Sequence, residues 1–235
     1  VELFPGYKAN RVDDDGEETE PDLLTPQIPV LLDVLDAYKI PIVGVDDYEA
    51  DDVIATYSKH EKGPIRIVTG DRDLFQLVDD RRDVKVVYLA KGISAHDLVD
   101  RKFIEEKYGI PGDRYALFAM IRGDASDGLP GIRGIGEKGA ATIAQHFASL
   151  DEAISAAENS DDRLSANVRK KLVEGKEYAA IAPKLVHCAV DVPLPTIDLR
   201  TPQILPSEDE ITRFKTELGL GSSIDRFSSV VSSLR

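Results

Sequence analysis

The stretch Ile65-Arg-Ile-Val-Thr69-Gly-Asp-Arg-Asp73 decides the fold, because a short apolar run passes directly into a turn that carries two carboxylates. The β-branched residues between Ile65 and Thr69 predict a buried strand. Gly70 marks the end of that strand, and Asp71 and Asp73 follow it. Ligands of open parallel sheets bind outside the carboxyl ends of the strands, so this turn is a candidate site.

Apolar runs and helical patterns alternate on both sides of this strand, which favours an α/β fold with a mostly parallel sheet flanked by helices. Further strands are predicted at 41–45 and 84–89. After residue 111 the pattern becomes entirely helical. The predicted helices span 27–38, begin near 48 and near 73, and then cover 94–108, 115–121, 139–147, 151–157, 164–176 and 207–218.

Two more acidic clusters accompany the first. Glu49-Ala-Asp-Asp52 follows the predicted strand at 41–45, and Gly123-Asp-Ala-Ser-Asp127 follows a predicted helix. Each cluster alone is typical of a helix cap or a turn. Together they supply seven carboxylates, which repel one another unless cations neutralise them. Hard oxygen ligands suit Mg²⁺ or Mn²⁺, and a pair of such ions can cleave a phosphodiester.

The third cluster runs into Gly128-Leu-Pro-Gly-Ile-Arg-Gly-Ile-Gly136, followed by Glu137-Lys138. This segment has the form of a helix-hairpin-helix, in which glycines allow tight turns and helix N-terminal amides face a phosphate. A glycine-rich connector between packed helices is the alternative. The hairpin interpretation predicts contact with the DNA backbone without base recognition. Its expected DNA-binding residues are Gly131, Gly134, Gly136 and Lys138.

Composition narrows the class of protein. The chain has 235 residues, 42% of them hydrophobic, which is enough for a substantial core. Its single cysteine, Cys188, excludes an intrachain disulfide, and we expect a cytoplasmic protein that acts as a monomer.

The net charge of −14, from 43 acidic and 29 basic residues, argues at first against a nucleic-acid partner. Much of the negative charge lies in the acidic clusters, which metals would offset, and in the run 13–18. Basic residues gather near the start of the chain and between 163 and 176. No apolar run is long enough to cross a membrane. We therefore keep DNA as the expected partner of a monomeric protein.

These motifs together resemble the bacterial and phage 5′-nuclease family, which includes flap endonucleases and the 5′-nuclease domain of DNA polymerase I. The three acidic clusters and the hairpin carry the resemblance, and Tyr7-Lys-Ala-Asn-Arg11 is similar to the Tyr-Lys-x-x-Arg of the family's helical arch. The agreement in order and spacing extends to about residue 185. It implies a PIN-like nuclease fold with a helix-3-turn-helix subdomain.

The resemblance also implies roles for individual residues. Lys8 and Arg11 would contact the scissile phosphate, and Tyr7 would stack on a base. Backbone carbonyls near Ile132 and Ile135 would bind K⁺. The first metal ion would be held by Glu49, Asp51, Asp52 and Asp71, and the second by Asp73, Asp124 and Asp127.

Family members begin with strands that supply two further aspartates, and this sequence opens on Val1-Glu-Leu3 without them. We therefore expect a ligand-bearing segment upstream of Val1. The predicted division is a nuclease core at 1–118 with the arch near 1–25, a helix-hairpin-helix subdomain at 119–185, and an extension at 186–235 that packs on the core.

The predicted function is a metal-dependent, structure-specific 5′ nuclease that acts on DNA with a 5′ flap or a free 5′ end, or on an RNA primer strand, in replication and repair. Two alternatives remain open at this stage. One is a non-catalytic DNA-binding module, and the other is a magnesium-dependent phosphatase of small molecules, which leaves the hairpin without a role.

Overall fold

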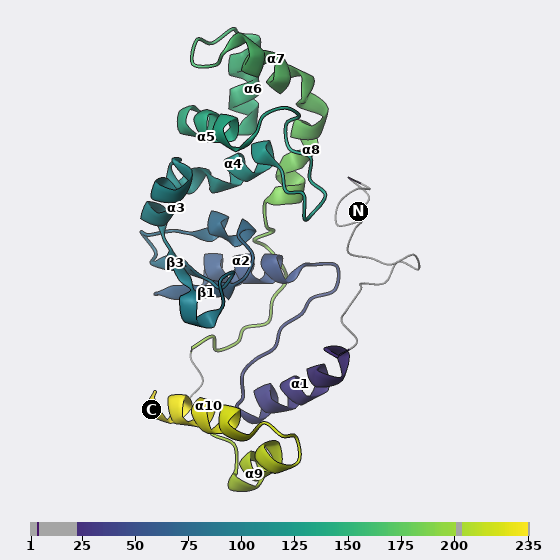
Figure 1. The fold of residues 1–235 in the computed structure, drawn as a ribbon, viewed down its shortest axis with the longest axis vertical. Coiled ribbons are helices and arrows are strands. Elements are labelled where there is room, and N and C mark those ends of the chain that lie inside the picture. The colour runs from purple at the N-terminus through teal and green to yellow at the C-terminus, as the bar shows by residue number, and fades with distance from the viewer. Residues whose placement is uncertain (1–3, 5–22, 201–203, 235) are drawn as a thin grey trace. The chain divides into compact units, whose positions relative to one another are not determined.

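The computed structural model describes Phe4, residues 23–200 and residues 204–234, and these residues form two compact units (Figure 1). The first unit contains residues 46–192, and the second contains the described residues of 23–45 and 193–234. No helix of the described residues is long and apolar enough to span a membrane. The predicted domain boundaries at 118 and 185 stay predictions.

The sheet of the first unit has three strands in the order β1-β2-β3. Strand β1 (Ile65–Thr69) pairs in parallel with β2 (Val84–Tyr88), which confirms both predicted strands. Strand β2 also pairs with β3 (Asp97–Val99), but in the antiparallel direction. The described sheet is therefore small and mixed, and the prediction of a mostly parallel sheet was wrong.

The predicted strand at 41–45 does not form. These residues have no β pairing, Pro41 has no amide hydrogen to donate, and the Ile42 side chain is 56% exposed. The predicted helix at 94–108 was also wrong in its first half, where β3 lies. The one α-helix in this range is α3 (Arg101–Tyr108), which starts at an Asp100 cap that accepts a hydrogen bond from the Phe103 amide at 2.8 Å.

The helical half of the first unit follows the sheet in sequence. Predicted helices near 48, 115–121, 139–147, 151–157 and 164–176 form within a few residues of their expected bounds, whereas the helix that follows Gly175 was not predicted. The segment after Asp73 is a short 3-10 helix, Asp73–Leu77. The α-helices are α2 (Ala50–His60), α4 (Tyr115–Arg122), α5 (Glu137–His146), α6 (Leu150–Glu158), α7 (Ala166–Glu174) and α8 (Lys176–Val186).

One apolar core joins the sheet to these helices. Leu74 and Phe75 of the 3-10 helix are fully buried in it. The Phe75 ring packs against Tyr88 of β2 and Tyr115 of α4, with ring centroids 5.0 and 5.2 Å apart. This packing fixes the turn that carries Asp71 and Asp73 between the sheet and α4.

The second unit is helical and has its own small core. It contains α1 (Ile28–Ala37), α9 (Glu208–Thr216) and α10 (Gly221–Ser233). Tyr38 is fully buried, packs on Phe227 at 4.5 Å between ring centroids, and its hydroxyl hydrogen-bonds with Ser228 at 2.6 Å. The sequence analysis predicted α1 and α9 but not α10.

Candidate functional site

The turn after β1 is shaped by its own polar side chains. The Asp71 amide donates to Thr69 Oγ1 at 2.9 Å, and the Asp73 amide donates to Asp71 Oδ1 at 2.8 Å. Such bonds from backbone amides to nearby side chains are ordinary turn chemistry. They place two carboxylates directly at the carboxyl end of β1, as the sequence predicted.

The third acidic cluster lies in a loop that closes on itself after α4. The Asp124 amide donates to the Leu129 carbonyl at 2.9 Å, and the Leu129 amide donates back to the Asp124 carbonyl at 2.7 Å. The loop is packed into the protein, so that Asp124 and Asp127 are only 8% and 7% exposed. Burial of two acids in one short loop is costly without partners of opposite charge.

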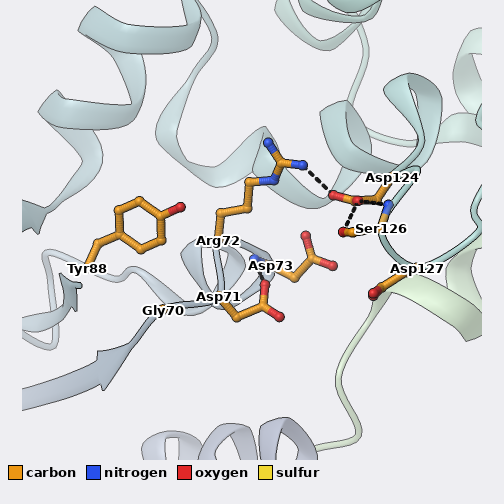
Figure 2. Close-up of a pocket in the computed structure, with 8 residues that line it drawn as sticks. All are labelled: Gly70, Asp71, Arg72, Asp73, Tyr88, Asp124, Ser126 and Asp127. Atoms are coloured by element: carbon orange, nitrogen blue, oxygen red, sulfur yellow. Dashed lines mark hydrogen bonds and ion pairs between the residues drawn. The ribbon is translucent and has the colours of Figure 1, made fainter. Parts of the chain in front are cut away.

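These two segments, more than fifty residues apart in sequence, meet at one cavity of about 200 Å³. Figure 2 shows the carboxylates of Asp71, Asp73 and Asp127 turned toward a shared space, with Asp124 beside it. The structure thus brings four of the seven predicted metal ligands together. The cavity is lined by Gly70, Asp71, Arg72, Asp73, Tyr88, Asp124, Ser126 and Asp127.

Asp73 is the carboxylate that this arrangement disfavours most. Burial, followed by the negative charges of Asp71, Asp124 and Asp127, raises the pKa of Asp73 to about 6. Its buried Oδ1 atom accepts no hydrogen bond from the described residues. A buried, partnerless carboxylate oxygen among like charges is a favourable position for a cation.

Asp124 is stabilised as a carboxylate by internal donors. Burial alone would raise its pKa, but hydrogen bonds from Ser126 and Arg72 outweigh that effect and lower the pKa of Asp124 to about 2. Ser126 donates to Oδ1 through its hydroxyl at 2.5 Å and its amide at 2.9 Å. Arg72 Nη2 lies 2.6 Å from Oδ2, and Arg122 Nη2 lies 3.5 Å from the same atom.

The acids of α2 lie outside the lining of this cavity. Glu49 and Asp52 form a capping box at the start of α2, in which the Glu49 amide donates to Asp52 Oδ2 at 3.1 Å. Asp52 Oδ1 accepts a hydrogen bond from the Ala189 amide at 2.7 Å. Burial, followed by the charges of Asp51, Asp52 and Asp73, raises the pKa of Cys188 to about 12. The acids of α2 and Asp73 of the cavity therefore both lie near the Cys188 thiol.

The donors of the site fit a hard divalent cation in type, because they are all carboxylates and one buried oxygen lacks a partner. In this structure, however, some of these carboxylates bind other groups of the protein. Asp124 is turned to Arg72, and Asp52 binds backbone amides. Within the described ranges, no three His, Cys, Asp or Glu side chains are arranged to hold a metal ion.

The hairpin lies against the end of α4. A Cβ atom on Gly131 would come within 2.6 Å of the Arg122 carbonyl carbon, and one on Gly123 within 2.5 Å of the Gly131 amide nitrogen. Both glycines also have positive φ angles, of 64° and 77°. The Ile132 amide donates to the carbonyl of Ile121 at 2.9 Å. Gly131 therefore has a packing role in addition to its predicted role in DNA binding.

The other predicted hairpin residues take defined places. Ile132 and Ile135 are buried, and the Ile135 amide donates to the Ile132 carbonyl at 2.9 Å. Gly136 is the N-cap of α5, which places exposed Lys138 in the first turn of that helix. The Gly134 carbonyl accepts a hydrogen bond from Lys171 Nζ at 2.5 Å. Binding of a phosphate by the amides at the start of α5 stays a prediction.

Tyr7, Lys8 and Arg11 lie outside the residues that the structure describes. Conversely, the structure places three side chains in the site that the sequence did not single out, namely Arg72, Arg122 and Ser126. A signal for two of them was present, because Arg72 and Ser126 lie inside acidic motifs. Arg122 directly precedes the third motif.

Comparison with known proteins gives two family matches that together cover most of the chain. Residues 1–109 match the family described as 5′-3′ exonuclease, N-terminal resolvase-like domain. Residues 110–208 match the 5′-3′ exonuclease, C-terminal SAM fold. The boundary between the two matches lies at the start of the all-helical half.

Individual relatives agree with these matches. A 5′-3′ exonuclease of Streptomyces coelicolor is 48% identical over 232 residues, which are 96% of this chain and 77% of the relative. DNA polymerase I of Caldicellulosiruptor bescii is 36% identical over 203 residues, which are 84% of this chain and 23% of the polymerase. The fold is similar to that of a bacteriophage T5 flap endonuclease solved with DNA and metal ions. That structure gives a TM-score of 0.60 at 19% identity and covers 98% of this chain and 77% of the phage protein.

Proposed function

The chain belongs to the 5′-3′ exonuclease family of phosphodiester hydrolases, and we propose that it is a divalent-metal-dependent 5′ nuclease with flap endonuclease activity on DNA. The observation that carries this proposal is the meeting of two acidic segments at one cavity beside the hairpin. The proposed substrate is DNA with a 5′ flap or a free 5′ end, including a strand that begins with an RNA primer.

We assign the metal ligands to the acidic residues of the site. Asp71, Asp73, Asp124 and Asp127 line the cavity, and the partnerless Asp73 oxygen supports this assignment. The acids of α2 complete the set as candidates for the first ion. When bound, two Mg²⁺ or Mn²⁺ ions would polarise the phosphodiester and neutralise the charge that develops during hydrolysis. The acids assigned to the first ion are Glu49, Asp51, Asp52 and Asp71, and those assigned to the second are Asp73, Asp124 and Asp127.

The other residues hold and orient DNA. The α5 amides after Gly136, with the charge of Lys138, would bind duplex phosphates, and the turn between Ile132 and Ile135 would accept K⁺ through its carbonyls. Lys8 and Arg11 would contact the phosphate at the cleavage position. Tyr7 would stack on the nearby base. Orienting the phosphodiester against the carboxylates is the contribution of these residues to the reaction.

A non-catalytic DNA-binding module has less support. It gives no reason for four carboxylates to gather at one cavity and raise the pKa of Asp73, whereas a nuclease needs that concentration of negative charge to recruit cations. The printed name of the Streptomyces coelicolor relative, a 5′-3′ exonuclease, also supports the enzymatic proposal.

The test is cleavage of a 5′-labelled flap substrate with Mg²⁺ or Mn²⁺ by the wild type, Asp124→Asn and Asp127→Asn. Each substitution should lower the cleavage rate by at least about 100-fold, because a charged ligand is lost at the reacting centre. Duplex affinity in Ca²⁺ should be kept or increased, since a negative charge near phosphate is removed. Asp113→Asn, at a carboxylate that pairs with Arg114 on the surface, is the matched control. A wild type that leaves the flap intact would refute the proposed activity.

A further inference from the structure

In the metal-free site, the positively charged side chain of Arg72 forms an ion pair with Asp124. Its Nη2 atom contacts Asp124 Oδ2 at 2.6 Å, and Figure 2 shows the arginine side chain extended toward that carboxylate. The two partners differ in burial, because the Arg72 side chain is 42% exposed and that of Asp124 is 9% exposed. The guanidinium group can therefore withdraw into solvent, whereas the carboxylate is held in its loop.

The remaining contacts of Asp124 explain why Arg72 is the partner that must leave. Ser126 donates hydrogen bonds to Asp124 Oδ1 from its amide and its hydroxyl, and these two bonds keep the carboxylate in place. Oδ2 is covered by Arg72 and more distantly by Arg122 at 3.5 Å. Arg122 is also fixed by a hydrogen bond from its Nε atom to the Gly123 carbonyl at 3.1 Å. A cation that binds Oδ2 has to displace Arg72, whose side chain is 42% exposed, whereas that of Arg122 is 12% exposed.

A second cavity offers a place for the displaced guanidinium. It has a volume of about 520 Å³ and lies beside the first, since Arg72 and Asp124 line both. Arg122, the Gly123 backbone and the turn at Gly128 also line it, with Glu137 as a further acid. Two arginines beside the hairpin form a favourable environment for a phosphate group, which guanidinium groups bind through paired donors.

We propose that Arg72 is a positioning residue that occupies Asp124 in the metal-free protein and moves to a DNA phosphate at the second cavity when a divalent cation takes Asp124. This inference rests on the proposed nuclease function. The exchange replaces the single positive charge of Arg72 at Asp124 with the two charges of a divalent cation, so that Asp124 has a cationic partner before and after metal binding. Arg72 thereby links metal binding to DNA binding, because the cation that releases Arg72 from Asp124 frees its guanidinium group for a phosphate.

The experiment uses the full chain with Arg72→Met and, as a matched control, Arg66→Met. Arg66, in β1, pairs with Asp83, which directly precedes β2, at 3.1 Å, and the Arg66 side chain is 41% exposed. Mn²⁺ binding without DNA is measured by isothermal titration calorimetry and by electron paramagnetic resonance. Arg72→Met should bind Mn²⁺ roughly tenfold more tightly than the wild type, because a competing charge-assisted hydrogen bond is removed. Arg66→Met should bind it as the wild type does.

The second measurement is duplex affinity in Ca²⁺ over a range of salt concentrations. Loss of one phosphate contact should weaken binding by Arg72→Met and lower the slope of log K against log salt by about one. Arg72→Gln, which keeps amide donors but no charge, repeats both measurements if Arg72→Met does not fold. If the wild type binds Mn²⁺ and cuts flaps but the folded Arg72 variant binds Mn²⁺ no more tightly, the inference about Arg72 is wrong and the proposed nuclease function still stands. A wild type that neither binds Mn²⁺ nor cuts refutes the proposed function itself.

Discussion

Asp73→Asn should stabilise the metal-free protein at neutral pH. The pKa of Asp73 rises from 3.8 to about 6, first through burial and then through its acidic neighbours. A tenfold change in proton affinity corresponds to about 1.4 kcal/mol, so the ionised side chain costs the native state about 3 kcal/mol as an upper value. Asparagine has nearly the same shape and no charge, and therefore removes this cost.

The sign of the pH dependence follows from the direction of the pKa shift. Because the native state binds the Asp73 proton more tightly than the unfolded chain does, acid favours folding at this residue. The cost is absent below pH 3.8, grows between pH 3.8 and 6, and is complete at higher pH. The gain from Asp73→Asn should thus reach 1 to 3 kcal/mol at pH 7.5, an estimate from the same linkage, and vanish near pH 4.

The assay is urea unfolding in EDTA at pH 7.5 and pH 4, followed by circular dichroism, with Asp113→Asn as a surface control. Mg²⁺ or Mn²⁺ should reverse the order of stability at pH 7.5, since bound cations stabilise the native wild type and find fewer ligands in the variant. Equal stability of Asp73→Asn and the wild type at pH 7.5, or an equal gain at both pH values, would show that the electrostatic reasoning is wrong.

Two further predictions concern the surroundings of the site. Gly131→Ala should destabilise the protein by at least about 2 kcal/mol in chemical unfolding, because a Cβ atom there meets the backbone of α4 at a positive φ; Gly136→Ala, in open space at φ −85°, should cost less than about 1 kcal/mol. Cys188 should react with iodoacetamide about a thousandfold more slowly at pH 8 than an ordinary thiol, since its pKa of about 12 leaves little thiolate. Mg²⁺ should raise that rate by neutralising Asp51 and Asp52, and a rate independent of Mg²⁺ would contradict this electrostatic link.

The sequence predicted the parts of the fold that depend on local interactions. The strand at β1 and its acidic turn were predictable because β-branched residues and turn chemistry act within a few positions. The segment at 41–45 has a similar apolar pattern but no partner strand among the residues that the structure describes, and pairing is a non-local property. The antiparallel β3 was missed for the same reason, since only its contact with β2 distinguishes it from a helix.

The candidate site shows a similar limit. Two of the three acidic motifs contain the four carboxylates that line the cavity, and these were predictable because carboxylates at this density indicate metal chemistry whatever the fold. Their partners could not be predicted, since the contact between Arg72 and Asp124 joins residues 52 positions apart. The bond from the Ala189 amide to Asp52 spans 137 positions. It turns a predicted metal ligand toward a structural role in the metal-free protein.

The close packing of Gly123 against Gly131 makes the hairpin and the Asp124 loop a single mechanical element. Asp124 directly follows the first of these glycines, and neither backbone can shift without displacing the other. A duplex that shifts the hairpin backbone at Gly131 would therefore also shift Gly123 and, one residue further along the chain, Asp124. On the proposed function, we expect mutations in this segment to change DNA affinity and metal affinity together.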